Sequence, residues 1–169
     1  MPSIYHCVFI AAPALKVYDA LTLQEALAAW WTSHTFAQPS VNTIAKFGFG
    51  LGYFKEMRIA ELIPGRSVKW ECITGASEWV GTSLSFILTS GHQYDWAEEH
   101  PEISDQLYQS VPGRETTLLT FEHSGWDAVT PMFAECNYTW GRFLRSLKLY
   151  CETGKGTPWP HQHTVNFSE

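Results

Sequence analysis

Residues 129–151 read VTPMFAECNYTWGRFLRSLKLYC, and this stretch decides the fold. Its apolar side chains recur every three or four residues, the spacing of one face of an α-helix. They are Val129, Phe133, Cys136, Trp140, Phe143, Leu144, Leu147 and Cys151. The pattern predicts a helix that begins near Asp127, tolerates Pro131 in its first turn and stops at Gly154. At about 1.5 Å per residue, about 23 residues span roughly 34 Å, enough to cross a whole curved sheet.

The chain before this helix consists mainly of β-like segments that are separated by turn signals such as Gly-Leu-Gly, Pro-Gly-Arg and Gly-Ala-Ser. These segments cover residues 4–10, 41–49, 53–63, 66–74, 79–89 and 115–123. Because the middle four are joined by short turns, they predict an antiparallel meander. The polar, Pro-containing stretch 32–40 predicts a loop.

Two short helices are predicted after the first strand. Pro13 ends that strand and suits the first turn of a helix over residues 13–21. Thr22-Leu23-Gln24-Glu25 then fits a capping box for a second helix that ends near Trp31. This order of elements predicts an α+β fold, in which a curved antiparallel sheet of six to seven strands wraps one long C-terminal helix.

The composition is charge-poor and aromatic-rich. The 169 residues suit one domain and include eight Trp, seven Tyr and ten Phe, with only 17% charged residues against about a quarter in a typical soluble domain. This balance excludes a disordered, collagenous or low-complexity chain. Close packing needs fewer bulky rings than this, which raises the question of whether some of them line a cavity.

Charge and cysteine usage exclude several function classes. A net charge of -6 disfavours binding to nucleic acid or to an anionic membrane surface. No apolar run is long enough for a membrane span, and no basic residue precedes the apolar stretch 4–15, so we expect a cytoplasmic protein. Cys7, Cys72, Cys136 and Cys151 lack zinc-site spacing; we expect reduced thiols, with Cys72 and Cys136 buried, and neither metal nor cofactor.

The alternation of side chains along each strand predicts which residues face the long helix. On segment 66–74 the inner residues are Val68, Trp70 and Cys72, whereas Lys69 and Glu71 point away. The inner sets of the next two segments are Val80, Thr82, Leu84, Phe86 and Leu88, followed by Leu119, Phe121 and His123. His123 is the titratable residue of this face, immediately before Ser124-Gly125-Trp126.

Several motifs occur together in the order of a known superfamily. They are Ala12-Pro13 with Val17-Tyr18-Asp19-Ala20-Leu21-Thr22, Trp30-Trp31-Thr32, Pro64-Gly65-Arg66 with Val68 and Trp70, Thr117-Leu118-Leu119-Thr120-Phe121 with His123-Ser124-Gly125-Trp126, and Trp140. The chain thereby resembles the START-like, or SRPBCC, helix-grip superfamily, in the branch similar to the C-terminal domain of the activator of the heat-shock protein 90 ATPase. The resemblance implies an antiparallel sheet that grips the C-terminal helix, with a hydrophobic cavity between them for a lipid-like or aromatic small molecule.

The resemblance leaves the function open, because members of this superfamily include lipid carriers, hormone receptors, polyketide cyclases, oxygenase subunits and chaperone activators. The chaperone activator has an additional N-terminal domain that this chain lacks, which disfavours a standalone co-chaperone. The absence of a Rieske-type Cys/His pattern disfavours an oxygenase subunit. We therefore expect binding of a hydrophobic small molecule rather than catalysis. The alternatives are a cyclase, dehydratase or hydrolase that uses His123, and a chaperone ATPase modulator.

The candidate ligand-binding residues follow from the inner face of the sheet and the apolar stripe of the helix. They are Trp70, Phe86, Phe121, His123, Trp126, Phe133, Trp140 and Phe143. The alternative is that these rings pack on one another and leave no cavity. His123 has three interpretations: a structural histidine bonded to a backbone carbonyl, a ligand contact, or a general base. The last needs an orienting carboxylate, and neither Glu56 nor Glu71 is clearly on the inner face.

Two segments lie outside this scheme. We expect a helix-grip domain at residues 1–154 and a C-terminal tail at 155–169 that lies loosely on the surface, with His161 and His163 but no third metal ligand nearby. The acidic insertion 90–114 is interpreted as a solvated loop or, alternatively, as a lid or a homodimer contact. Pro101 could start a short helix in it that ends near Ser110.

Overall fold

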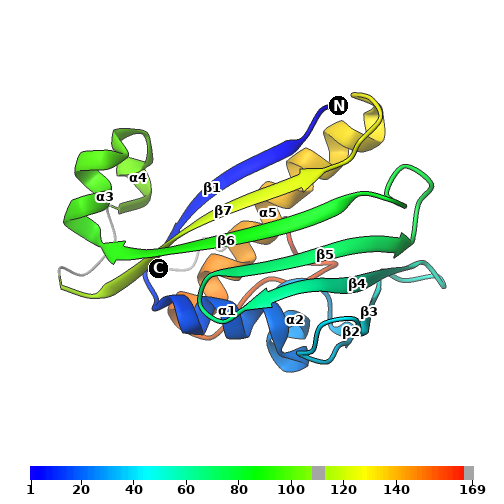
Figure 1. Ribbon diagram of the computed structural model, residues 1–169, viewed down its shortest axis with the longest axis horizontal. Helices are drawn as coiled ribbons and strands as arrows, with labels where there is room; N and C mark the ends of the chain where they lie inside the picture. The colour runs from blue at the N-terminus through cyan, green and yellow to red at the C-terminus, as the bar shows by residue number, and fades with distance from the viewer. Residues whose placement is uncertain (108–112, 166–169) are drawn as a thin grey trace.

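The computed structural model describes residues 1–107 and 113–165, and within them seven strands form one antiparallel sheet (Figure 1). The strands lie side by side in the order β1-β7-β6-β5-β4-β3-β2. Their bounds are β1 Ile4–Ile10, β2 His34–Phe36, β3 Ile44–Gly48, β4 Phe54–Ile63, β5 Ser67–Thr74, β6 Ser83–His92 and β7 Glu115–Ser124. The predicted meander is confirmed.

The long helix α5, Pro131–Thr153, crosses one face of this sheet, behind the strands in the view of Figure 1. The two predicted short helices are α1, Ala14–Thr22, and α2, Gln24–Trp30, and they pack beside α5 on the same face. The predicted α+β class, with a curved sheet wrapped around a C-terminal helix, is therefore confirmed. None of the helices among the described residues is long and apolar enough to cross a bilayer.

Both ends of α5 are fixed by local chemistry. The Thr130 side chain accepts a hydrogen bond from the backbone N–H of Phe133, and Pro131 occupies the first turn. Gly154 ends the helix in a left-handed conformation with φ of 84°. The predicted start near Asp127 is wrong, because Thr130 precedes a proline and is extended; Val129 is 72% exposed and takes no part in the helix.

The alternation predicted for the sheet is confirmed on the central strands. Val68, Trp70 and Cys72 on β5 and the three predicted residues on β7 are buried, as are Leu84, Phe86 and Leu88 on β6. Val80 is instead 50% exposed, because residues 76–82 form a turn in which the Trp79 N–H donates to the Ala76 carbonyl. The strand predicted from residue 79 therefore begins only at Ser83.

Two other local predictions are wrong. The capping box fails because Thr22 remains in α1, where its hydroxyl donates to the Tyr18 carbonyl, and Leu23 precedes α2 without a side-chain cap. The predicted loop 32–40 contains β2, which pairs with β3 through Thr35 opposite Phe47. A three-residue edge strand gives too short a pattern for sequence alternation to identify.

The acidic insertion is folded, so its interpretation as a solvated loop is wrong. It contains α3, Gln93–Glu99, a 3₁₀ turn, Pro101–Ile103, and α4, Ser104–Leu107. Pro101 does start a helical turn, whereas the predicted end near Ser110 lies outside the described residues. Trp96, Ile103 and Leu107 pack on Phe9, Ala11 and Leu118, on the face of β1 and β7 that points away from α5. The insertion therefore does not cover the inner face as a lid.

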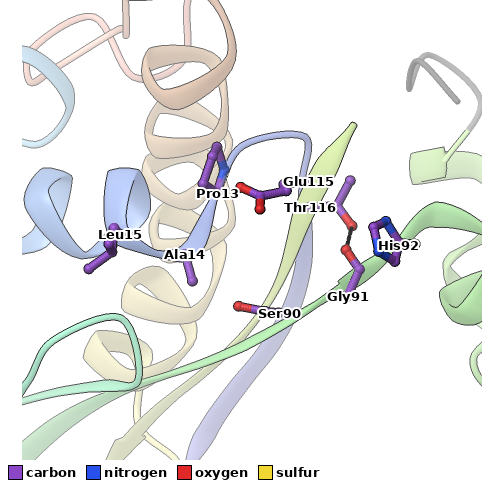
Figure 2. A pocket seen from close by; sticks show the side chains of 8 residues that line it. All are labelled: Pro13, Ala14, Leu15, Ser90, Gly91, His92, Glu115 and Thr116. Carbon is purple, nitrogen blue, oxygen red and sulfur yellow. Dashed lines mark hydrogen bonds between the residues drawn. The ribbon is translucent and has the colours of Figure 1, made fainter. Parts of the chain in front are cut away.

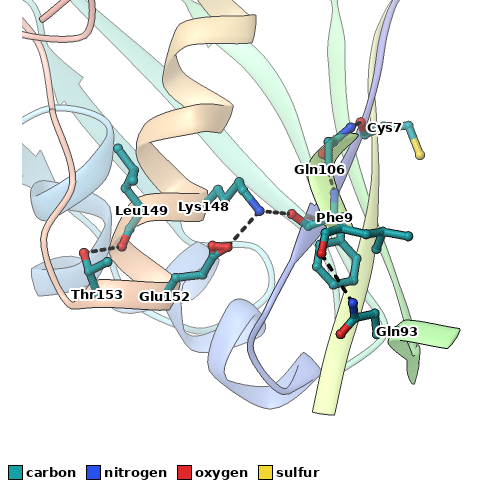
Figure 3. A network of polar contacts seen from close by, with 9 residues as sticks. Cys7, Phe9, Gln93, Gln106, Lys148, Leu149, Glu152 and Thr153 are labelled. Atoms are coloured by element: carbon teal, nitrogen blue, oxygen red, sulfur yellow. Dashed lines mark hydrogen bonds and ion pairs between the residues drawn. The ribbon is translucent and has the colours of Figure 1, made fainter. Parts of the chain in front are cut away.

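The free edge of β1 is covered by side chains from two elements (Figure 3). The Phe9 N–H donates to Oε1 of Gln106 at 2.9 Å, and Nε2 of Gln106 donates to the Cys7 carbonyl at 3.3 Å. Nζ of Lys148 donates to the Phe9 carbonyl at 2.7 Å and pairs with Glu152. Gln106 thus occupies hydrogen-bonding positions that another strand would use.

The first part of the C-terminal tail is bound to the body of the protein, so the expectation of a loose tail is wrong for these residues. The Thr157 N–H donates to Oγ of Ser146 at 2.7 Å, and that hydroxyl donates to the Trp30 carbonyl. The Trp159 N–H donates to the Trp31 carbonyl at 2.7 Å. The Trp159 ring meets Phe49 edge-on at 6.0 Å. The tail consequently braces the segment that follows α2.

The cap of α5 gives a direct stability test. Thr130→Ala removes the acceptor for the Phe133 N–H and should lower the free energy of unfolding by about 1 kcal/mol. Thr130→Ser, which retains the hydroxyl, is the matched control and should lose much less. Urea unfolding followed by circular dichroism measures both; equal losses in the two variants would contradict a capping role.

Candidate ligand-binding site

A pocket of about 280 Å³ lies between α5 and the turn that joins β3 to β4. Its mouth carries exposed side chains, among them Tyr53, Met132 and Glu135. Its inner wall consists of buried rings from the residue that follows α2, from the 76–82 turn and from α5. These rings are Trp31, Trp79, Trp140 and Phe143. The arrangement is an apolar hollow of the kind that holds small molecules.

Of the rings predicted to line a cavity, Trp140 and Phe143 line this pocket. The centroid of Trp140 lies 5.3 Å from that of Trp31 and 4.6 Å from that of Phe121. These contacts join the pocket wall to the core of the sheet, so the wall is supported from behind.

The other predicted rings pack among themselves instead of reaching this pocket. Trp70, Phe86 and Phe121 are fully buried, with Phe86 4.9 Å from Trp70 and 5.2 Å from Phe121. Trp126 meets Phe133 edge-on at 5.3 Å. Part of the predicted ring set is therefore close-packed core, and part of it borders a hollow.

Sequence reasoning missed Trp31, Phe49, Lys55 and Trp79 as pocket residues. Trp31 and Trp79 lie at a helix end and in a turn, where strand alternation says nothing about direction. The inward direction of Lys55 could have been predicted from the sequence. Lys55 shares the odd-numbered face of β4 with the buried Met57 and Ile59, and strict alternation therefore directs it inward.

His123 is buried beside this wall, and both of its ring nitrogens are occupied. Nε1 of Trp140 donates to Nδ1 at 3.2 Å, which leaves the proton on Nε2, 2.8 Å from Oγ1 of Thr82. The Thr82 hydroxyl donates onward to the Trp79 carbonyl at 2.6 Å. Burial, with the Lys55 charge as a smaller cause, lowers the pKa of His123 to about 3.

This network makes His123 a neutral histidine held by the side chains of Thr82 and Trp140, and not by a backbone carbonyl as in the structural interpretation. A contact with a ligand or a role as general base would first require the loss of one of these hydrogen bonds. The geometry therefore favours a positioning function: His123 fixes the indole of Trp140 in the pocket wall.

Lys55 brings a positive charge into the apolar pocket. Its Nζ lies 4.1 Å from the ring centroid of Phe49, 4.3 Å from Trp79 and 5.1 Å from Tyr53. Such cation–π contacts favour the ammonium form. Burial acts in the opposite sense and lowers the pKa of Lys55 to about 8.

The cysteines near the pocket are thiols, as expected. All four cysteines are free, and Cys72 and Cys136 are buried. Nε1 of Trp79 lies 3.2 Å from Sγ of Cys136, and burial raises the pKa of Cys72 to about 11. These thiols are protonated near neutral pH, so they add no negative charge around Lys55.

Figure 2 shows a second hollow, of about 500 Å³, between the start of α1 and the ends of β6 and β7. Its polar side chains Ser90, His92 and Glu115 are exposed, and Thr116 donates a hydrogen bond to the Gly91 carbonyl. This groove encloses a guest less well than the aromatic pocket does.

Among the described residues, no group of three or more His, Cys, Asp or Glu could hold a metal ion. His163 instead stacks on Tyr138 at 5.3 Å.

The fold and the pocket define a class of protein: a curved antiparallel sheet that grips a C-terminal helix beside an aromatic pocket. Comparison with solved structures agrees with the fold in this description. The solution structure of the Aha1 dimer from Colwellia psychrerythraea is similar over 92% of this chain and 100% of that chain, with a TM-score of 0.71 and 32% identity. The chain belongs to the START-like helix-grip superfamily.

More distant structures share the fold. DynU16, from the dynemicin biosynthetic locus, matches 91% of this chain but only 48% of its own chain, at 21% identity and a TM-score of 0.62. CalU16 from Micromonospora echinospora matches 88% of this chain and 73% of its own, at 17% identity and a TM-score of 0.59. Neither a family model nor a curated protein matches the sequence significantly.

The lowered pKa of His123 predicts an acid-dependent loss of stability. Its folded pKa of about 3 lies below the ordinary value of 6.5, so the unfolded chain binds more protons and this contribution is full above pH 6.5. As the pH falls from 6.5 towards 3, the stability should decrease by up to about 1.4 kcal/mol per pH unit.

The control is His123→Gln, which does not titrate. Urea unfolding of both proteins between pH 7 and pH 5 should give a steeper decline for the wild-type protein. Parallel declines would show that His123 does not carry this pH dependence.

Proposed function

We propose that this protein binds a small apolar or aromatic molecule in the pocket between α5 and the β3–β4 turn. The observation that carries the proposal is an aromatic wall beside a hollow of about 280 Å³. This volume is near the lower end of ligand pockets, which hold roughly 300–1,000 Å³. The ligand is consequently small, of the size of one fused ring system rather than a long-chain lipid.

The proposed contacts are Trp140 and Phe143, which the sequence also indicated, together with Trp31, Phe49 and Trp79. Burial of apolar ligand surface on these rings would stabilise the complex by about 25 cal/mol per Å² before association costs. We assign the binding domain to residues 1–154. In this proposal the tail assists binding from outside, because Trp159 contacts Phe49 and the backbone of Trp31.

The likeness to the Aha1 dimer supports a second candidate, the modulation of a chaperone ATPase that the sequence resemblance implies. A homodimer remains a further prediction of this likeness. An enzyme that uses His123 has less support, because both nitrogens of that ring are already hydrogen-bonded.

Filling the pocket provides the test of small-molecule binding. Thr139 lies on α5 at the pocket, whereas Ala134 on the same helix is exposed and does not line it. Thr139→Phe should reduce binding of a naphthalene-sized probe at least tenfold because the new ring occupies the hollow. Ala134→Phe adds the same ring elsewhere and should leave affinity unchanged. Isothermal titration measures both affinities, and native mass spectrometry of the purified protein shows whether a guest co-purifies.

The chaperone candidate makes a different prediction. If the protein modulates an ATPase, it should associate with the chaperone in a pull-down and raise ATP turnover, and Thr139→Phe should retain this stimulation. Light scattering on the same samples gives the oligomeric state. Unchanged ATP turnover at saturating protein would eliminate this candidate.

A further inference from the structure

Lys55 is an unneutralised cation inside a largely apolar site. Among the described residues, it is the cationic side chain in the lining of the aromatic pocket, and no carboxylate oxygen lies within ion-pair distance of its Nζ. By contrast, two other basic residues have carboxylate partners: Arg58 pairs with Glu71, and Lys148 with Glu152. The ammonium group of the lysine at the pocket instead lies over the ring faces of Phe49, Tyr53 and Trp79.

This arrangement costs free energy that a suitable guest can recover. A charge removed from water is unfavourable unless an opposite charge or hydrogen-bond acceptors replace the lost solvent. Ring faces replace the lost solvent only in part, because they attract the ammonium group but carry no full negative charge. Burial lowers the pKa of Lys55 to about 8, so its charged form is less favourable than that of a lysine in water.

The titratable groups that face Lys55 do not supply the missing charge. Cys72 and Cys136 have raised pKa values and are neutral thiols at neutral pH, and the lowered pKa of His123 makes it a neutral imidazole. The pKa of the Tyr53 phenol is also raised by burial, so it is neutral. Glu135 stands exposed at the mouth, where solvent screens it.

We propose that the guest of this pocket is an apolar acid, a compact aromatic or aliphatic body that carries one carboxylate and places it against Nζ of Lys55. The inference rests on the proposed function and narrows it to a ligand class. The aromatic wall holds the body, and the lysine selects the acid over a neutral molecule of the same shape. Because an added anion favours the ammonium form, binding raises the pKa of Lys55 and takes up protons above neutral pH.

The experiment compares two probes of matched shape, 2-naphthoate and 2-naphthylmethanol, by isothermal titration at pH 7. With the wild-type protein, the acid should bind at least tenfold more tightly than the alcohol. Lys55→Met retains an apolar side chain of similar length without the charge, and should abolish this preference while alcohol affinity changes less than threefold. Lys55→Arg retains the cation and should preserve the preference.

A second measurement uses the wild-type protein alone, so it can be made even if Lys55→Met fails to fold. Titration of the wild-type protein with 2-naphthoate at pH 8.5, in two buffers of different ionisation enthalpy, should show net proton uptake. Acid affinity should fall as the pH rises through about 8, because the free lysine loses its proton.

The outcomes separate the inference from the function on which it rests. If neither probe binds, small-molecule binding of this size class is wrong. If both bind equally, without proton uptake, the pocket is a binding site but the acid selection by Lys55 is wrong. A preference for the acid that persists in Lys55→Met would likewise overturn the role of Lys55, because another group would then recognise the carboxylate.

Discussion

The packing of Trp31 against the rings around it is the contact on which the rest of the structure depends. This indole follows α2 and lies 4.3 Å from Phe47, 5.6 Å from Trp70 and 5.3 Å from Trp140 between ring centroids. This single buried side chain therefore joins β3, the central strand β5 and α5. Its carbonyl also receives the Trp159 N–H, so the tail is tied to the same point.

The same contact supports the inner wall of the pocket. Rings behind Trp31 are close-packed, and close packing resists movement of the wall because small volume changes in a core are costly. In front of it, the ammonium group of Lys55 lies 4.1 Å from the ring centroid of Phe49 and 4.3 Å from that of Trp79, and moving it deeper into the core would add a desolvation cost. His123 differs from Lys55 because it is fully buried and neutral. It holds the Trp140 indole by accepting a hydrogen bond from it.

The fold could be predicted from the sequence because periodicity reports burial, and burial defines the sheet and α5. The helix end at Gly154 and the inner set on β7 followed from that information alone. The first residues of the elements were less predictable, because local backbone preferences override the apolar pattern there. The helix α5 begins at Pro131 and not near Asp127, and β6 begins only at Ser83, after a turn.

The pocket was predictable only in part, because its lining combines regular and irregular segments. The positions of Trp140 and Phe143 in the lining followed from the apolar stripe of the helix. Those of Trp31 and Trp79 depend on how a helix end and a turn come together in the fold. No local pattern encodes such a meeting. The hydrogen-bond partners of His123 were beyond sequence reasoning for the same reason, since Thr82 and Trp140 are 41 and 17 residues away.

The amide of Gln106 has a consequence for how copies of this chain can meet. A free strand at the margin of a sheet invites continuous sheet growth from molecule to molecule. Here the Cys7 carbonyl and the Phe9 N–H and carbonyl of β1 already have partners from α4 and α5. An approaching strand would have to expel a glutamine and a lysine before it could bond to these groups. This margin therefore acts as a barrier to templated aggregation.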